Sequence, residues 1–169
     1  MKIMHLIGLM ILCFGLCYCK KSKDTNNTTN HINCDGLITD TLGTGDNAKI
    51  YMPNAFTPNS DGLNDISRPY TQNVTAIAFT IYDGDNNVMF STTTLGQGWT
   101  TTSSPNTWSA YYYKIQVTTV GGHHIGKCGE LYKLSCFPGS IPKSSLYFED
   151  QLTPIGFTVV TLESMGTCP

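Results

Sequence analysis

Apolar and polar residues alternate one by one along two segments of the chain. This is the pattern of a β-strand with one face on a hydrophobic core. In residues 111–119, large apolar side chains share one face and polar ones the other; the apolar set is Tyr111, Tyr113, Ile115 and Val117. In residues 76–81 the same alternation places Ile77, Phe79 and Ile81 together. The pattern predicts two strands that line one core.

Clusters of turn-forming residues separate further β-rich segments. Residues 83–87, Asp-Gly-Asp-Asn-Asn, join the strand that ends at Tyr82 to a partner beginning at Val88, which predicts a hairpin. A Gly-Gly pair at 121–122 turns the strand 111–119 into a strand over 124–134. Residues 37–38 form a candidate first strand, and no segment keeps a helical period over a useful length.

About seven short strands separated by turns predict an all-β fold, an immunoglobulin-like antiparallel β-sandwich over residues 34–134. Residues 135–169 form a C-terminal β extension with two more candidate strands, 145–148 and 157–162. Their apolar content predicts that the extension packs on the sandwich and completes or covers a sheet edge that is otherwise open to pairing.

The N-terminus has the pattern of a targeting segment. Lys2 precedes an almost uninterrupted apolar run over residues 3–18, which is shorter than the ~20 residues that span a bilayer and is typical of a signal peptide. The run ends Leu-Cys-Tyr-Cys-Lys-Lys-Ser and resembles a bacterial lipobox, with residues 1–18 as the signal peptide and Cys19 as the lipidated residue. An ordinary signal peptide that happens to contain cysteines is the alternative.

The residues after Cys19 are polar and nearly free of apolar anchors. Residues 19–33 bury too little surface to offset chain entropy, so they are expected to be a flexible tether. Leader and tether together predict an outer-membrane lipoprotein of the cell envelope; the sequence leaves the periplasmic and surface faces open.

Four of the seven cysteines follow the leader: Cys34, Cys128, Cys136 and Cys168. In an exported domain this number predicts two disulfides. We favour Cys128–Cys136, a short loop across the exit of the last strand, and therefore Cys34–Cys168. A metal site with His123 and His124 is the competing interpretation, but the close paired-cysteine spacing of a zinc site is absent.

Residues 53–65, Pro-Asn-Ala-Phe-Thr-Pro-Asn-Ser-Asp-Gly-Leu-Asn-Asp, form a dense run of turn formers behind an apolar anchor. We call this segment the signature loop. One interpretation is a turn held by Asn and Asp side chains. The other is a calcium loop, since oxygen-bearing residues alternate around a central glycine; the candidate ligands are Asn59, Asp61, Asn64 and Asp65.

The signature loop resembles the opening motif of the gliding motility-associated C-terminal domain of Bacteroidetes proteins, the type B sorting domain of type IX secretion. Further matching pieces follow in order through the Gly-Trp at 98–99, the tyrosine-rich strand at 111–115 and the closing strand at 129–134. The resemblance covers about residues 49–134. It implies a β-sandwich and an association with secretion or gliding machinery.

The chain departs from the family pattern in three places. Asp-Gly-Asp follows Tyr82 where the family usually has Arg-Trp-Gly, and Thr-Thr follows Trp99 where it has Asp-Gly. The family domain normally ends its protein, whereas 35 residues follow Leu134 here (169 minus 134). A signal read at a free C-terminus is therefore in question.

Candidate chemistry is sparse. A Gly-x-Ser-x-Gly elbow, a His-Glu-x-x-His pair and a phosphate-binding Gly-x-x-x-x-Gly-Lys loop are all absent, so no enzyme is expected. The net charge of −2 and the lack of a basic stripe argue against nucleic acid. Aromatic side chains could stack on sugar rings; the candidates are Trp99, Trp108 and Tyr112, with a core role as the alternative.

Two functions follow. The first is a non-enzymatic cell-envelope lipoprotein whose sandwich resembles the type IX sorting domain and serves structurally or with secretion and gliding machinery. The second is a module that binds carbohydrate or another surface ligand through exposed aromatics. Export through type IX secretion despite the extension is a third, weaker possibility.

Overall fold

The fold is described from a computed structural model, which describes residues 33–43, 46–158 and 160–169. The leader, the predicted lipidation site Cys19 and the tether up to residue 32 lie outside the described residues. Within the described residues, no helix is long and apolar enough to cross a membrane.

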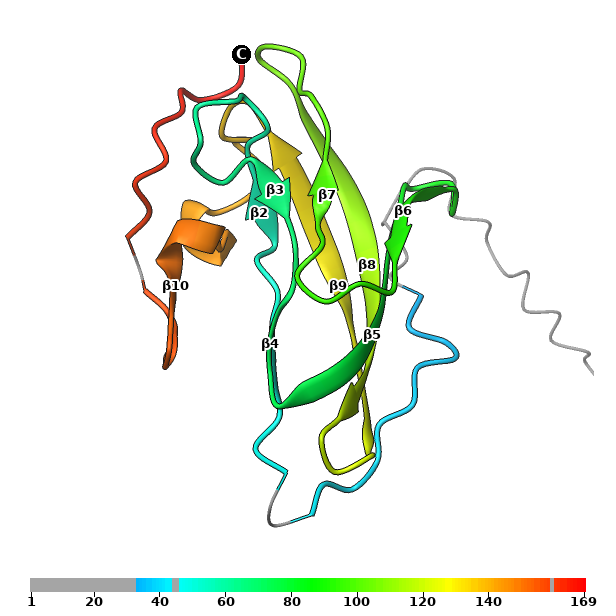
Figure 1. The fold of residues 1–169 in the computed structure, drawn as a ribbon. Helices are drawn as coiled ribbons and strands as arrows, with labels where there is room; N and C mark the ends of the chain where they lie inside the picture. The colour runs from blue at the N-terminus through cyan, green and yellow to red at the C-terminus, as the bar shows by residue number, and fades with distance from the viewer. Residues whose placement is uncertain (1–32, 44–45, 159) are drawn as a thin grey trace, which may run out of the picture.

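A five-stranded sheet forms the larger layer (Figure 1). Its strand order is β2 (Ala55–Phe56), β9 (His124–Leu134), β8 (Trp108–Thr119), β5 (Val74–Tyr82) and β6 (Val88–Thr92). The strands pair antiparallel except β2, which runs parallel to β9. The hairpin predicted around residues 83–87 is β5–β6, and the strand predicted over 124–134 is β9.

Two short ribbons form the second layer. β1 (Lys49–Tyr51) pairs with β4 (Tyr70–Gln72), and β3 (Ile66–Ser67) pairs with β7 (Trp99–Thr100), both antiparallel. They lie over one face of the five-stranded sheet (Figure 1). The structure confirms an all-β fold of antiparallel sheets that face one another.

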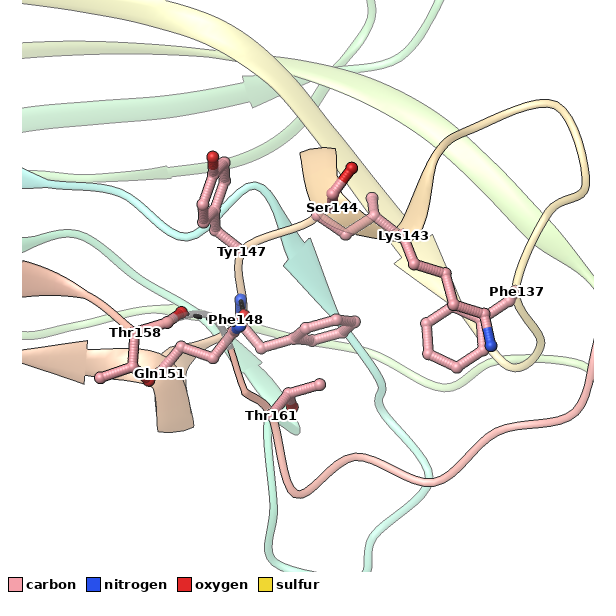
Figure 2. A pocket seen from close by; sticks show the side chains of 9 residues that line it. Phe137, Lys143, Ser144, Tyr147, Phe148, Gln151, Thr158 and Thr161 are labelled. Carbon is pink, nitrogen blue, oxygen red and sulfur yellow. Dashed lines mark hydrogen bonds between the residues drawn. The ribbon is translucent and has the colours of Figure 1, made fainter.

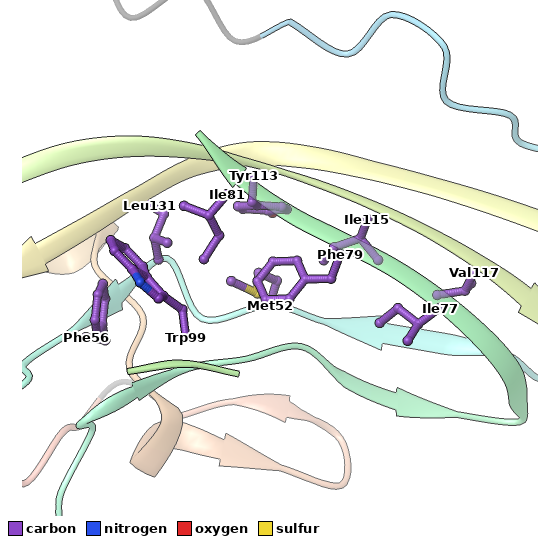
Figure 3. Packing of buried hydrophobic residues seen from close by; sticks show 10 residues of the cluster. All are labelled: Met52, Phe56, Ile77, Phe79, Ile81, Trp99, Tyr113, Ile115, Val117 and Leu131. Carbon is purple, nitrogen blue, oxygen red and sulfur yellow. The ribbon is translucent and has the colours of Figure 1, made fainter. Parts of the chain in front are cut away.

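The core lies between these layers (Figure 3). Ten buried side chains form it: Met52, Phe56, Ile77, Phe79, Ile81, Trp99, Tyr113, Ile115, Val117 and Leu131. The β5 and β8 residues are those that the alternation placed on one face, and the register sets Phe79 opposite Ile115 and Ile81 opposite Tyr113. Cross-strand pairs of this kind are the unit of sheet stabilisation.

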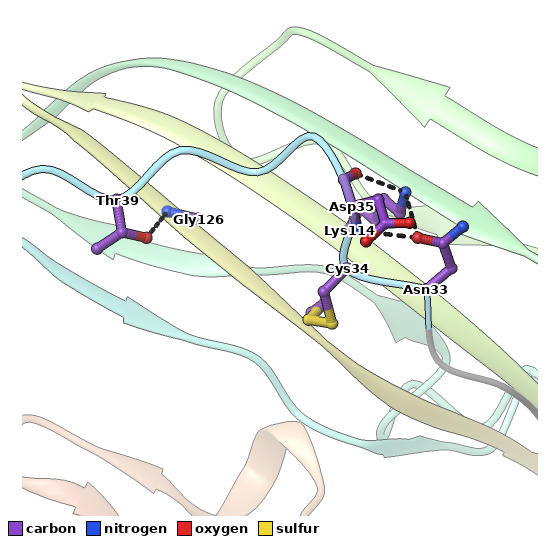
Figure 4. The surroundings of a disulfide bond; sticks show 7 residues. Asn33, Cys34, Asp35, Thr39, Lys114 and Gly126 are labelled. Atoms are coloured by element: carbon purple, nitrogen blue, oxygen red, sulfur yellow. Dashed lines mark hydrogen bonds between the residues drawn. A yellow bond between two sulfur atoms is a disulfide. The ribbon is translucent and has the colours of Figure 1, made fainter.

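Residues 33–43, which we call the strap, lie along the outer face of β8 and β9 (Figure 4). The expected strand at 37–38 does not form. The Gln116 side chain instead bonds both backbone groups of Ile38, at 2.7 Å to N and 2.8 Å to O. Gly126 permits the contact, because a Cβ there would lie 2.7 Å from the Leu37 Cβ.

The extension contains two short 3₁₀ helices, η1 (Lys143–Ser145) and η2 (Glu149–Gln151), and a hairpin of β10 (Leu152–Thr153) and β11 (Gly156–Phe157). The expected strand at 145–148 does not form, and of the expected strand at 157–162 only Phe157 lies in a strand among the described residues. Pro142 fixes the start of η1, and the Pro154 turn ends pairing within two residues. Phe137, Leu146 and Phe148 of the extension pack with Ala55 and Leu134 in a second buried cluster.

The structure joins Cys34 to Cys128 and Cys136 to Cys168, with Cα–Cα distances of 5.7 and 5.0 Å. The four cysteines are therefore disulfide-bonded, but the pairing we favoured is wrong. Cys128 lies within β9 and Cys136 just beyond its end. Eight residues of extended chain span about 26 Å, whereas a disulfide needs its Cα atoms within about 7 Å.

Candidate functional site

The signature loop is organised around one carboxylate. Asp65 Oδ1 accepts the backbone N–H groups of Asn59 and Ser60 at 3.0 and 2.7 Å, and Oδ2 accepts that of Gly62 at 2.8 Å. The backbone turns tightly here, with φ of 68° at Ser60 and 88° at Gly62. This is the loop expected from a run of Asn, Asp and Gly, whose side chains bond nearby N–H groups.

The other candidate ligands also bond within the loop. Asn59 Oδ1 accepts the Asp61 N–H at 3.0 Å, and Asp61 Oδ1 accepts the Leu63 N–H at 2.8 Å. Within the described ranges, no three His, Cys, Asp or Glu side chains gather as they do around an ion. The structure thus describes a self-bonded turn, and calcium binding stays a prediction.

The fourth candidate ligand, Asn64, faces the extension. Its Nδ2 donates to Glu163 Oε2 at 3.0 Å, and its Oδ1 accepts the Asp150 N–H at 3.0 Å. Thr57 Oγ1 donates to the same Glu163 oxygen at 2.6 Å. Glu163 is only 8% exposed. A buried carboxylate is stable when donors surround it, and here two of those donors belong to the signature loop.

The edge of the sheet at β2 is also covered by the extension. The Tyr147 carbonyl accepts the N–H groups of Asn54 and Ala55 at 3.0 and 3.1 Å. The Asn54 side chain accepts the Tyr147 N–H at 2.6 Å and donates to the Ser145 carbonyl at 2.8 Å. The extension therefore supplies partners that an exposed sheet edge lacks.

An ion pair also joins the extension to the sandwich. Arg68 Nη2 lies 2.5 Å from Glu149 Oε1, and Arg68 Nε donates to the Tyr70 hydroxyl at 2.9 Å. The hydrogen bond to Glu149 raises the pKa of Arg68. Burial, and then Glu149, raise the pKa of Tyr70 to about 12. The ion pair is half-buried, so it orients the extension more than it stabilises it.

The two histidines lie away from the signature loop, beside the β8–β9 turn. His123 Nδ1 contacts Asp46 Oδ2, and His124 Nδ1 lies 3.0 Å from Asp40 Oδ2. All four cysteines are in disulfides, so they are not ligands of a metal site with these histidines. His124 instead holds the strap against the sheet through Asp40, and His123 contacts Asp46, which lies beyond the strap.

Two of the three candidate sugar-stacking aromatics are buried, which contradicts that assignment for them. Trp99 is 7% exposed and lies in the core, 5.4 Å from the Phe56 ring. Tyr112 is 4% exposed and stacks on Tyr82 at 4.8 Å. The alternation placed Tyr112 on the outer face, but it could not show that Tyr82 and the β5–β6 turn cover it. Trp108 is 39% exposed, and its ring centroid lies 6.4 Å from that of Tyr132 in a tilted pair.

The extension encloses a cavity of about 340 Å³ (Figure 2). Phe137, Leu146, Tyr147 and Phe148 line it together with polar side chains, among them the buried Gln151, which is bonded to the backbone of Phe148 and Thr158. Lys143 Nζ lies 4.0 Å from the centroid of the Phe137 ring at one end. The cavity belongs to the extension and reaches neither the signature loop nor the core.

Comparison with protein families identifies the central part of the chain. Residues 50–131 match the CHU_C type IX secretion signal domain, which confirms the resemblance drawn from the signature loop. No match was found among the curated proteins, and none among the solved structures. The matched segment contains the whole signature loop and stops before the extension. It connects the chain with type IX secretion and with the cell envelope.

Proposed function

We propose that the protein, whose residues 50–131 match the CHU_C type IX secretion signal domain, is a non-enzymatic lipoprotein of the cell envelope. Cys19 anchors it to the outer membrane, and the sandwich acts structurally or together with secretion and gliding machinery. In this proposal the signal domain stays in the mature protein as a folded module, and it is not a C-terminal sorting signal that is cleaved off.

The main support for this proposal is that the extension packs on the signature loop. Glu163, near the end of the extension, is bonded to Thr57 and Asn64, and the Cys136–Cys168 disulfide fixes the two ends of the extension to each other. In the described structure these bonds keep the extension folded over the signature loop. This supports a resident module over a terminal sorting signal, which is read at a free end.

The N-terminal side supports an anchor. The lipobox-like sequence ends at Cys19, a polar tether follows, and the Cys34–Cys128 disulfide then attaches the chain after the tether to β9. A lipid anchor gains from a flexible spacer between bilayer and domain. Two disulfides also suit an oxidising compartment outside the cytoplasm.

The test is the intact mass of the native protein with both termini mapped. We expect an acylated Cys19 and a retained Pro169, and we expect the Cys19→Ser variant to leave the membrane fraction. A chain without lipid that is cut near Leu134 would overturn the proposal and make export through type IX secretion the function.

A further inference from the structure

We infer that the signal domain carries a peptide-binding surface and that residues 135–169 are its built-in occupant. The surface consists of the free edge of β2, the apolar residues beside it and the Thr57–Asn64 side of the signature loop. Its other ligand is an extended peptide that carries apolar side chains and a carboxylate. The inference concerns the folded chain and does not depend on lipidation.

The first element of recognition is a sheet edge. The Asn54 and Ala55 N–H groups point to the Tyr147 carbonyl, and the Asn54 side chain bonds backbone groups of Ser145 and Tyr147 on the occupant. These bonds read main-chain atoms and not side-chain identity. Edge pairing of this kind is a general mode of peptide capture.

The second element is an apolar contact. Leu146 and Phe148 are both buried against Ala55 and Leu134, which lie on neighbouring strands of the sheet. The two occupant side chains flank the residue whose carbonyl bonds the edge. An extended peptide with apolar residues at two alternate positions reproduces this arrangement, because residues two apart share a face.

The third element selects charge. Thr57 Oγ1 and Asn64 Nδ2 converge on a single carboxylate oxygen of Glu163, at 2.6 and 3.0 Å. Both donors belong to the matched domain, and the acceptor belongs to the extension. Buried donors left without an acceptor are costly, so this part of the surface favours a ligand that brings a carboxylate.

The occupant is a separable unit. β10 and β11 pair only with each other, so no described strand of the extension adds to either layer of the sandwich. Phe137 bonds residues 166 and 168 through its backbone N–H and C=O, and the Cys136–Cys168 disulfide closes the same loop. The extension can therefore leave the surface as a closed loop while the strands of both layers of the sandwich keep their ladder hydrogen bonds.

The direct test frees the surface by changing only the occupant. In the full-length Leu146→Asp/Glu163→Lys variant the extension loses its apolar and carboxylate contacts, while every surface residue stays intact. The probe is a fluorescent synthetic peptide of residues 135–169 with its disulfide formed. We expect saturable binding to this variant and none to the wild type, whose surface is occupied.

The matched control is the same peptide with Glu163→Gln. It loses the charge of the acceptor, so we expect about tenfold weaker binding. No binding of the unaltered peptide to a variant that keeps the wild-type fluorescence of the buried Trp99 would overturn the inference. Equal affinity of the two peptides would overturn the carboxylate selectivity.

A second measurement does not depend on that variant. Amide hydrogen exchange of Asn54 and Ala55 reports release of the Tyr147 carbonyl. In Cys136→Ser/Cys168→Ser we expect these amides to exchange about tenfold faster while β8 amides are unchanged. The control, Cys34→Ser/Cys128→Ser, alters the strap and leaves them as in the wild type. Exchange of these amides only together with the β8 amides in every variant would show that the extension is inseparable from the core.

Discussion

At the scale of single residues, the Asp65 carboxylate holds the signature loop together through its hydrogen bonds. It accepts three backbone N–H groups, whereas Asp61 accepts one. We expect Asp65→Ala to lower the free energy of unfolding by about 1–3 kcal/mol, because the loop N–H groups lose their acceptor. Urea denaturation measures the loss.

The control for this prediction is Asp61→Ala, which should cost less. A loss for Asp61→Ala equal to that for Asp65→Ala would contradict the hydrogen-bond account. The same proteins test the calcium prediction. If the loop binds the ion, calcium chloride raises the Tm of the wild type and not that of Asp65→Ala.

Gly98, next to the buried Trp99, is required for close packing. A Cβ at this position would lie 2.5 Å from Ile66 Cγ2 and 2.7 Å from the Ser67 carbonyl oxygen, so β3 would have to move. We expect Gly98→Ala to destabilise the protein by about 1–3 kcal/mol, measured by thermal unfolding. Gly139→Ala is the control, because a Cβ there meets nothing within 4 Å; similar losses in both variants would refute the steric explanation.

At the scale of elements, the long strands were predictable and the short ones were not. β5 and β8 carry enough alternating residues for a clear pattern. β9 is marked at its start by the Gly-Gly turn at 121–122. β2, β3 and β7 have two residues each, which is too short for any periodicity. Residues 37–38 are apolar and β-prone, yet they follow the Gln116 side chain along a sheet face and not a neighbouring strand.

The candidate site was predictable only in part, for a similar reason. The internal bonds of the signature loop are local, so Asn, Asp and Gly at this spacing predict them. The bonds from Glu163 to Thr57 and Asn64 span 106 and 99 residues of sequence, and no local pattern marks them. The burial of Tyr112 depends likewise on a stacking partner from another strand.

The two disulfides close loops of different length, 94 and 32 residues. In the chain-entropy account the longer loop stabilises more, by about 1 kcal/mol. We therefore expect Cys34→Ser/Cys128→Ser to lose more unfolding free energy than Cys136→Ser/Cys168→Ser. Guanidinium denaturation without reductant compares them, and the reverse order would show that the strain or contacts of the extension outweigh loop entropy.

At the scale of the whole molecule, stability has an acid and an alkaline limit. The backbone N–H and then the side chain of His124 lower the pKa of Asp40 below its usual 3.8, and hydrogen bonds from Thr119 and then His123 lower that of Asp46. Carboxylates with a lowered pKa stabilise the fold above their usual pKa, and this stability is lost as the pH falls toward the folded pKa. We expect the urea midpoint to fall below about pH 4.

The alkaline limit comes from buried phenols. Burial first raises the pKa of Tyr70, Tyr113 and Tyr132 from 10.0 to about 12. Between these values the unfolded chain loses protons that the fold retains, so stability falls as the pH rises. Lys127, whose pKa burial lowers, acts in the opposite direction. We expect a declining urea midpoint above about pH 10 and a smaller decline in Tyr113→Phe; an unchanged slope in that variant would contradict this assignment.

The two disulfides also determine how the molecule carries mechanical tension. From residue 34 the covalent path crosses to Cys128, follows β9 to Cys136 and crosses to Cys168. That path holds eight peptide steps (136 minus 128), a contour of roughly 28 Å, whereas the uncrosslinked chain from 34 to 168 holds 134 steps, roughly 460 Å. A pull between the two ends therefore loads β9 and the segment just after it. The chain between Cys34 and Cys128 and the chain between Cys136 and Cys168 lie off this covalent path, and the domain acts as a short, nearly inextensible link.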